Sequence, residues 1–188
     1  MKIDISKLAE LTELLKAGDK VELSGWIYTG RDAAHKRFAQ LISENKDLPF
    51  PVKNSVIYYA GPTGTKEGMV IGSCGPTTSG RMDPYTPDLL DMGLKGIIGK
   101  GERNSKVVEA ITKNKAVYFC AIGGAGALAC KCIKKCEIIA FEDLGCESVK
   151  KLYIEDFPLI VAIDCHGGNI FKSGRPIYSK QQYIDNNT

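Results

Sequence analysis

A short polar turn over residues 75–85 holds the side chains best suited to bind a ligand. It reads Gly75-Pro76-Thr77-Thr78-Ser79-Gly80-Arg81-Met82-Asp83-Pro84-Tyr85 and lacks a hydrophobic period. Backbone N–H groups, hydroxyls and a guanidinium are the groups that bind a carboxylate or a phosphate. The same residues could form only a structural connector, but a connector does not require Arg81. We therefore predict a site for a small anion.

The segments on either side of this turn predict how it is held. The apolar run over residues 69–72 predicts a strand before the turn. After the turn, Thr86 could cap a helix that has Pro87 in its first position. We therefore expect the turn to connect a strand to a helix.

Two further clusters could add cations to this site. Arg31 and Asp32 open a predicted helix directly after a strand, and His35 lies one turn later on the same face. A cation at a helix N-terminus opposes the helix dipole, which favours a purpose other than helix stability, although a surface cation beside a structural histidine fits equally well. Lys100 ends a predicted strand between two glycines, where open α/β sheets bind ligands. Together with Arg81, these cations could bind one dianion.

The elements that must position these clusters alternate along most of the chain. Strands are predicted over residues 20–27, 55–59, 96–99, 116–122, 137–141 and 159–164. Helices are predicted over 5–17, 32–43, 105–113, 126–135 and 148–152. This order predicts an α/β domain with a mostly parallel sheet, flanking helices and a second β layer from the amino-terminal part. We expect one domain over residues 1–179 and a polar tail over 180–188.

Composition restricts the class of protein and its partners. The 188 residues are 44% apolar and 25% charged with a net charge of +3, which is ordinary for a globular domain. The scattered lysines form neither a nucleic-acid stripe nor a polybasic membrane patch, and the pair Lys150-Lys151 reads as a solvated helix face. No apolar run approaches the roughly 20 residues of a membrane span, and no signal-peptide core is present. We expect a cytoplasmic protein that binds neither nucleic acid nor membrane.

The seven cysteines form an odd number, which argues for reduced thiols and against a disulfide framework. Cys130, Cys132 and Cys136 could be metal ligands. The predicted helix, however, places only Cys132 and Cys136 on one face, and no CxxC motif accompanies them. We therefore expect buried thiols that behave as small hydrophobic residues, and we predict no metal site.

The segment Gly124-Ala125-Gly126-Ala127 follows a predicted strand, and Glu142-Asp143 end the next one. This matches the form of a dinucleotide-binding fingerprint. The pattern is permissive, however, and the roughly 60 remaining residues are short for the rest of a doubly wound domain. Close packing of a helix on a strand, or a contribution to the anion site at Thr77, explains the glycines better.

These motifs together resemble the beta subunit, or carboxy-terminal domain, of the iron–sulfur-dependent class I fumarases and the related tartrate dehydratases. The resemblance spans nearly the whole chain, and its motifs are Gly30 to His35, Gly75 to Asp83, Gly99 to Gly101, Gly123 to Ala127, Glu142 to Gly145 and Glu155 to Pro158. Several motifs in one order are highly specific, where each alone is weak. The resemblance implies a swivelling β/β/α domain.

The resemblance also implies the activity and the partner. The chain would be the beta subunit of a fumarate hydratase, a hydro-lyase of the tricarboxylic acid cycle that is active only with a larger alpha subunit. That alpha subunit would hold a 4Fe-4S cluster on three cysteines, so this chain would bind no cofactor. The enzyme would be a hetero-oligomer, and the isolated chain could form a homodimer.

The substrate-binding roles follow from the same resemblance. Arg31, Arg81 and Lys100 would bind the dicarboxylate, fumarate or malate, with Thr78 and Gly75 beside them. Both carboxylates of the substrate must be held while water is added or removed. The three cations therefore match a dicarboxylate site.

Thr77 matches the threonine that is proposed as the catalytic base in this family. A threonine hydroxyl is a poor base unless neighbouring cations depress its pKa. His35 and Asp32 would orient the arginine at the start of their helix, and Asp83 would support the polar turn.

Small differences within the family favour the fumarase branch. Tartrate dehydratases carry bulkier residues where this sequence has Gly30, Ala34 and Gly80, and a glutamate in place of the segment 83–85. The segment 164–168 departs from the fumarase pattern. An L-tartrate dehydratase beta subunit is therefore the alternative, and a non-catalytic module that binds a dicarboxylate or nucleotide and regulates a partner is another.

Overall fold

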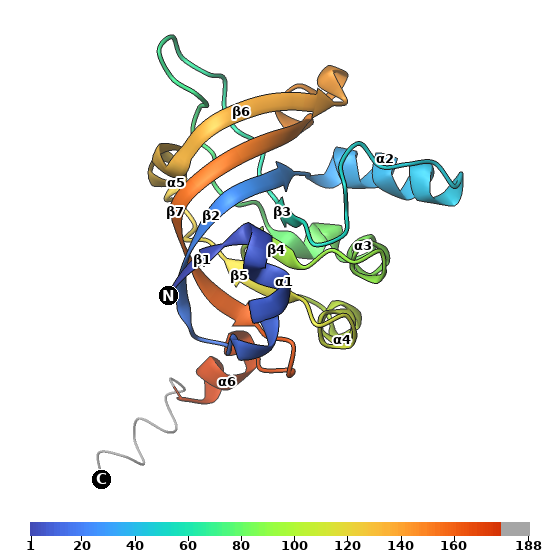
Figure 1. Cartoon of the computed structure of the whole chain (residues 1–188), viewed down its shortest axis with the longest axis vertical. Coiled ribbons are helices and arrows are strands. Elements are labelled where there is room, and N and C mark those ends of the chain that lie inside the picture. Colours follow the sequence, from blue (N-terminus) through green and yellow to red (C-terminus); the bar gives the residue numbers. More distant parts are fainter. Residues whose placement is uncertain (178–188) are drawn as a thin grey trace.

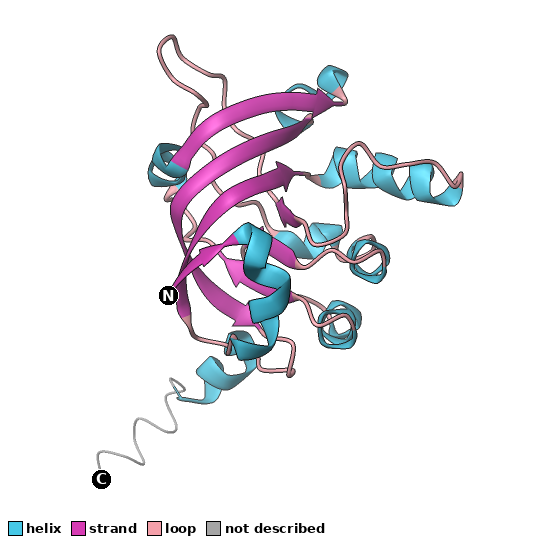
Figure 2. Ribbon diagram, viewed as in Figure 1, coloured by secondary structure: helices cyan, strands magenta, loops and turns pink. Residues whose placement is uncertain are grey.

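Five strands close a barrel-like ring in this computed structural model, which describes residues 1–177 (Figures 1 and 2). The parallel neighbours are β2 (Lys20–Thr29), β3 (Val56–Tyr58), β4 (Gly96–Gly99) and β5 (Val117–Cys120). The long strand β7 (Val149–Ile163) pairs antiparallel with both β5 and β2 and so closes the ring. At the edges, β1 (Lys2–Asp4) pairs with β2, and β6 (Ile133–Ala140) pairs with β7.

Three helices lie together on one side of the ring, and Figure 1 shows them apart from β6 and α5. They are α2 (Asp32–Ser43), α3 (Thr86–Asp91) and α4 (Ser105–Lys113). The other helical segments are η1 (Ile5–Lys7), α1 (Leu8–Leu11), η2 (Thr12–Leu14), η3 (Ser79–Met82), α5 (Gly126–Cys132), η4 (Glu142–Glu147) and α6 (Ile170–Ile177). The architecture is thus a ring with one helical layer.

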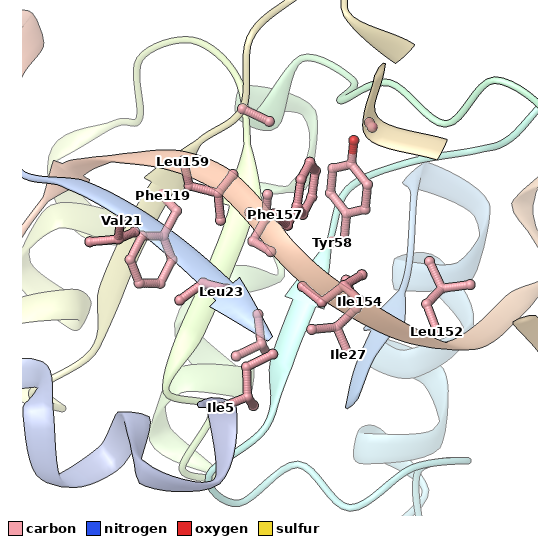
Figure 3. Close-up of a cluster of buried hydrophobic side chains, with 14 of the residues drawn as sticks. Ile5, Val21, Leu23, Ile27, Tyr58, Phe119, Leu152, Ile154, Phe157 and Leu159 are labelled. Atoms are coloured by element: carbon pink, nitrogen blue, oxygen red, sulfur yellow. The ribbon is translucent and has the colours of Figure 1, made fainter. Parts of the chain in front are cut away.

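Apolar side chains fill both faces of the central strands. Successive residues of a strand point to opposite faces, so β5 sends Phe119 into the ring and Tyr118 toward the helices. Figure 3 shows the cluster that includes Leu23, Phe119 and Ile154. The second cluster, which includes Phe38 and Ile111, lies between ring and helices. Because both faces are buried, the central strands are almost wholly apolar.

The prediction of an α/β fold is confirmed, and several elements match closely. The helices over 32–43 and 105–113 and the strand over 96–99 have the predicted bounds. The mostly parallel sheet is correct from β1 to β5 and wrong afterwards, because β6 and β7 form an antiparallel pair. The second β layer is not a separate sheet, since all seven strands belong to one sheet that curls back on itself.

The largest error concerns residues 148–152, where we predicted a helix and the structure has the start of β7. Lys150 is buried, and its Nζ donates to the Ser148 hydroxyl over 2.6 Å and to the Ser148 carbonyl over 3.2 Å. The interpretation of this lysine as part of a solvated helix face was therefore wrong. Nearby acceptors, which a sequence pattern does not show, satisfy its ammonium group.

Other predicted elements are shorter or absent. The helix predicted over 126–135 ends at Cys132, and Cys136 lies on β6, so the two thiols do not share a helix face. The predicted helix over 5–17 consists of three short segments that end at Leu14. Residues 69–72 form no strand, since residues 70–72 are bends, and Met69 is 45% exposed. The cap of α3 is Tyr85, while the residue that we expected to cap lies inside the helix.

Two predictions on domain organisation stay predictions. The tail over 180–188 lies outside the described residues, and no observation tests the boundary at residue 179. Over residues 1–177, no helix combines the length and the apolar character needed to cross a membrane.

Candidate functional site

The predicted site residues follow the carboxyl ends of parallel strands. Arg31 follows β2, Lys100 follows β4, and the glycine-rich segment 123–126 follows β5. Because these strands and β3 are parallel neighbours in one sheet, their carboxyl ends meet at one edge of the ring. This edge is where α/β folds bind ligands.

The polar turn crosses this edge of the sheet. The Thr77 N–H donates to the carbonyl oxygen of Tyr59, just after β3, over 2.7 Å. Thr78 pairs in parallel with Lys100, just after β4. The structure therefore brings both threonines to the segment that holds the lysine.

Ser79, which sequence analysis did not single out, fastens the turn to β4. Its hydroxyl oxygen accepts hydrogen bonds from the Lys100 N–H and from the Tyr118 hydroxyl, each over 3.0 Å. A Cβ added at Gly99 would lie 1.9 Å from this oxygen. Gly99 therefore serves the close approach of turn and strand, while Gly101 adopts a positive φ of 84°.

The glycine-rich segment packs directly on the turn. The Cys74 N–H donates to the Gly126 carbonyl over 3.1 Å. A Cβ at Gly126 would lie 3.0 Å from the backbone nitrogen of Gly75. These contacts support close backbone packing as the purpose of the glycines and explain why small residues stand at both positions.

Two arginines share one carboxylate at this edge. The Arg31 Nη2 lies 3.8 Å from Oδ2 of Asp32, and the Arg81 Nη1 lies 3.9 Å from the same oxygen. The Arg31 side chain is 22% exposed and the Arg81 side chain 56% exposed, so both guanidinium groups can reach a ligand. The structure thus unites two arginines that lie far apart in the sequence.

Glu147 is a site residue that sequence analysis missed. Its Oε2 accepts a hydrogen bond from the Ala33 N–H over 2.9 Å, and its Oε1 lies 3.4 Å from Nη2 of Arg31. A carboxylate at the start of α2 also matches the helix dipole. It stands 114 residues from Ala33, so no local pattern points to it. The buried Nε of Arg31 has no hydrogen-bond partner within residues 1–177.

His35 is fully buried beneath the start of α2. Its Nδ1 lies 2.9 Å from the carbonyl oxygen of Arg31, and its ring packs edge-on against Phe38 and Tyr59. Burial, aided by the nearby Arg103 cation, lowers the pKa of His35 to about 4. The imidazole is therefore neutral at pH 7, and its Nδ1–H donates to the carbonyl that precedes α2.

Asp83 is buried in an ion pair with Arg103, a second residue that sequence analysis missed. The Arg103 Nε donates to Asp83 Oδ1 over 2.6 Å, and the Asn104 N–H donates to Oδ2 over 2.8 Å. The Arg103 Nη2 also donates to the Thr86 hydroxyl over 2.8 Å. Asp83 thus joins the polar turn to the start of α4.

Tyr59 lies at the centre of these contacts. The ring of His35 packs edge-on against the Tyr59 ring, with the two centroids 5.1 Å apart. The Arg103 guanidinium lies 5.4 Å from the centroid of the Tyr59 ring. Its hydroxyl and that of Thr86 are hydrogen-bonded at 3.0 Å, and its carbonyl holds Thr77. One buried tyrosine therefore contacts the segments that carry both arginines and the threonine.

The cysteines are all free thiols, and most of them lie in or pack against the two apolar clusters. Cys130, Cys132 and Cys136 are partly buried beside the inner cluster, as expected for small hydrophobic residues. Burial raises the pKa of the Cys74 thiol to about 12, which opposes the thiolate form that binds metal. Among residues 1–177, no three or more His, Cys, Asp or Glu side chains gather in a way that could hold a metal ion.

Comparison with known proteins shows the family of the chain. A family model described as Fumarase C-terminus matches residues 1–174. The chain belongs to this family. The match confirms the resemblance that the ordered motifs indicate.

Individual relatives differ in how much of their length the chain covers. The anaerobic class I fumarate hydratase of Escherichia coli (strain K12) is 39% identical over 180 residues, which are 92% of this chain and 32% of that protein. Fumarate hydratase 2 of Leishmania major is 37% identical over 91% of this chain and 30% of its own length. The putative L(+)-tartrate dehydratase subunit beta of Methanocaldococcus jannaschii is 37% identical over 88% of this chain and 89% of its own length. The chain thus spans about a third of these fumarate hydratases and most of the tartrate dehydratase subunit.

The buried His35 makes the stability of this family member depend on pH. Its folded pKa lies below its usual value of 6.5, so the unfolded chain takes up a proton that the folded chain excludes. We expect the free energy of unfolding to fall by about 2–3 kcal/mol as pH decreases from about 6.5 to about 4. Urea unfolding of wild type and His35→Gln at several pH values measures this. The exposed His166 offers the control His166→Gln, and equal pH slopes for wild type and His35→Gln would contradict the expectation.

Removing the partner of Asp83 should destabilise the fold strongly. Arg103→Met leaves a buried carboxylate without its cation, and we expect a loss of about 3–5 kcal/mol in the free energy of unfolding. Adding Asp83→Asn should restore part of that loss, and urea unfolding of both single variants and the double variant gives the coupling energy. Lys113→Met, which breaks an exposed pair with Asp91, should cost less than about 1 kcal/mol. Additive single effects would show that the buried pair does not act as a unit.

Proposed function

We propose that this chain is the beta subunit of a class I fumarate hydratase, a hydro-lyase that reversibly adds water to fumarate to give L-malate. One observation carries this proposal. Arg31, Lys100 and the pair Thr77 and Arg81 come from three segments that follow or cross the carboxyl ends of the parallel strands, in a member of the fumarase C-terminus family. Three cations at one edge suit a substrate with two carboxylates.

The contacts of the arginines support their role in binding substrate. Asp32 lies near both guanidinium groups at distances of 3.8 and 3.9 Å, longer than a good hydrogen bond. A substrate carboxylate could therefore take shorter, charge-assisted bonds to donors that this carboxylate leaves unused. Arg81, more than half exposed, would offer a bidentate fork. Arg31 would be held in place by Glu147.

The polar turn would supply the proton-transfer group and further contacts. Thr77 would remove the proton from the carbon next to one carboxylate, with its hydroxyl pKa depressed by the cations Arg81 and Lys100. Thr78 and Gly75, neighbours of Thr77 on the turn, would contact the bound substrate. These roles require that the turn keep its position when the substrate binds.

Three further residues would hold the substrate-binding side chains in position. His35 and Asp32 would orient Arg31, the first through its hydrogen bond to the backbone and the second through its carboxylate. Asp83 would hold the turn through Arg103. None of the three would need to touch the substrate.

The metal chemistry would belong to a partner subunit. A 4Fe-4S cluster on an alpha subunit would act as a Lewis acid for the hydroxyl that leaves malate. The raised thiol pKa of Cys74 fits poorly with cluster ligation by this chain, and residues 1–177 hold no group of three or more His, Cys, Asp or Glu side chains that could bind a metal ion. The M. jannaschii relative is named a subunit beta, which supports a separate partner and a hetero-oligomer. We also propose a cytoplasmic location, which seven free thiols favour.

L-tartrate dehydration is a second candidate reaction. The match to this chain covers 89% of the tartrate dehydratase subunit, whereas it covers only 32% of the E. coli fumarate hydratase. Two residues used to favour the fumarase branch pack behind the site: a Cβ at Gly30 would lie 3.0 Å from Ile57, and Ala34 is fully buried. Packing therefore explains the small size of Gly30 and Ala34 more directly than contact with the substrate does. Assays with fumarate, malate and tartrate distinguish the two reactions.

The complex with its alpha subunit, produced together and kept anaerobic, should interconvert fumarate and malate. In that complex, Thr77→Ala should lower kcat by about 100-fold or more, because proton transfer loses its base. The exposed loop residue Thr65 gives the control Thr65→Ala, for which kcat should not change. Undiminished turnover in Thr77→Ala would favour a regulatory module that binds a dicarboxylate or nucleotide. Inactivity of the wild-type complex toward all three acids would contradict the hydro-lyase proposal.

Arg81→Lys should weaken substrate binding in the same complex. Lysine keeps the charge and loses the bidentate fork, so we expect KM to rise about tenfold or more with a smaller change in kcat. Arg37→Lys, at a partly exposed ion pair with Asp143, is the matched control and should leave KM unchanged. An unaltered KM for both fumarate and malate in Arg81→Lys would rule out a direct carboxylate contact.

A further inference from the structure

We propose that an apolar groove around Ile122 is the surface on which the larger polypeptide of the complex docks, an inference that rests on the function proposed above. The groove, here called the Ile122 groove, consists of two adjoining hollows of about 600 and 330 Å³. The two hollows share Glu22, Ile122 and Pro158. They lie along β2 and β7, beside the segment that follows β5.

The groove exposes large apolar side chains. Ile122 and Leu128 are each 64% exposed. Both lie in the chain after β5, a strand whose side chains are almost all buried. Figure 1 shows α5, which carries Leu128, on the side of the ring away from α2, α3 and α4. Here α5 packs on β7 and leaves Leu128 exposed. Contiguous apolar patches of this kind mark interaction sites.

The groove is continuous with the candidate site. Pro76 and Ala125 line one of its hollows, and Pro76 directly precedes Thr77. On the same loop as Ala125, a Cβ at Gly123 would lie 3.7 Å from Cδ of Lys100. A polypeptide seated in the groove would therefore border the open side of the anion site. It could then contribute the groups that this chain lacks.

The charges around the groove favour an apolar occupant. Nζ of Lys2 lies 2.9 Å from Asp156 Oδ2 and 3.7 Å from Glu22 Oε2. Lys20 and Lys131 also line the hollows, so three lysines stand against two carboxylates and the two signs nearly balance. The surface therefore has no strong field of one sign to select a nucleic acid or a highly charged peptide. An apolar segment with a polar border fits it best.

The family relationship identifies which polypeptide this is. In the E. coli relative, the matched region is 32% of one continuous chain, so the remaining two thirds are covalently joined to it. In this protein the corresponding part would come from a second chain and would need a non-covalent surface. A second copy of this chain is a poorer occupant, because two identical hollows that face each other leave their volumes unfilled.

Glutamate substitutions in the groove test this inference. Ile122→Glu and Leu128→Glu place a charge where the partner would bury an apolar side chain, and each should weaken binding of the alpha subunit at least about tenfold. Leu14, which is 69% exposed and does not line the groove, gives the control Leu14→Glu, which should bind like wild type. Titration of labelled beta subunit with alpha subunit measures the affinity. Thermal unfolding of the free variants should match wild type, since all three sites are exposed.

Different binding results would contradict the docking surface alone or the proposed function as well. If wild type binds the alpha subunit and both groove variants bind equally well, the docking surface is wrong while the function stands. Equal weakening by Leu14→Glu would also overturn it, because the effect would not be specific to the groove. If the free chain dimerises through Ile122 while the variants still bind the alpha subunit, the occupant is a second copy. If wild type does not bind the alpha subunit, the proposed function and the docking surface both fail.

Discussion

The buried ion pair between Arg103 and Asp83 is the contact on which the geometry of the site depends. Both side chains are shielded from water, so either one alone would be strongly destabilising and the pair tolerates little displacement. The pair joins the segment after β4 to the polar turn, and the aromatic ring of Tyr59 extends the contact to His35 at the start of α2. Segments that carry the candidate ligands are thereby held to one another and not only to the sheet.

The ring of strands explains why the site lies open at one edge. Four parallel strands bring four connecting segments to the same edge, while β7 pairs antiparallel with β5 and β2 and closes the ring. The Asp32 carboxylate lies between the two arginines at distances of 3.8 and 3.9 Å, too long for strong hydrogen bonds. Such an arrangement keeps the cations separated yet available to a stronger acceptor.

Elements with a clear local signal were predictable from the sequence, and others were not. The helix α4 has an apolar stripe and an Asn104 side chain that accepts from the Val107 N–H, so its bounds match. Residues 148–152 misled us because paired lysines resemble a solvated helix face, whereas Lys150 is buried among carbonyl and hydroxyl oxygens. The apolar run before the polar turn misled us because hydrophobicity alone does not distinguish a strand from an exposed bend.

The sequence by itself determined the family and the α/β class, and its short ordered motifs carry the residues of the proposed anion site, Arg31, Thr77, Arg81 and Lys100. Only the tertiary structure decided which neighbours hold them. Glu147 accepts a hydrogen bond from Ala33 at the start of α2, although the two residues are 114 positions apart in the sequence. Arg103, in the segment after β4, pairs with Asp83 on the polar turn. Burial is likewise a property of the closed ring and not of the local sequence, and it is the main cause of the lowered pKa of His35. Contacts between distant segments depend on how the strands close, and no local pattern encodes that closure.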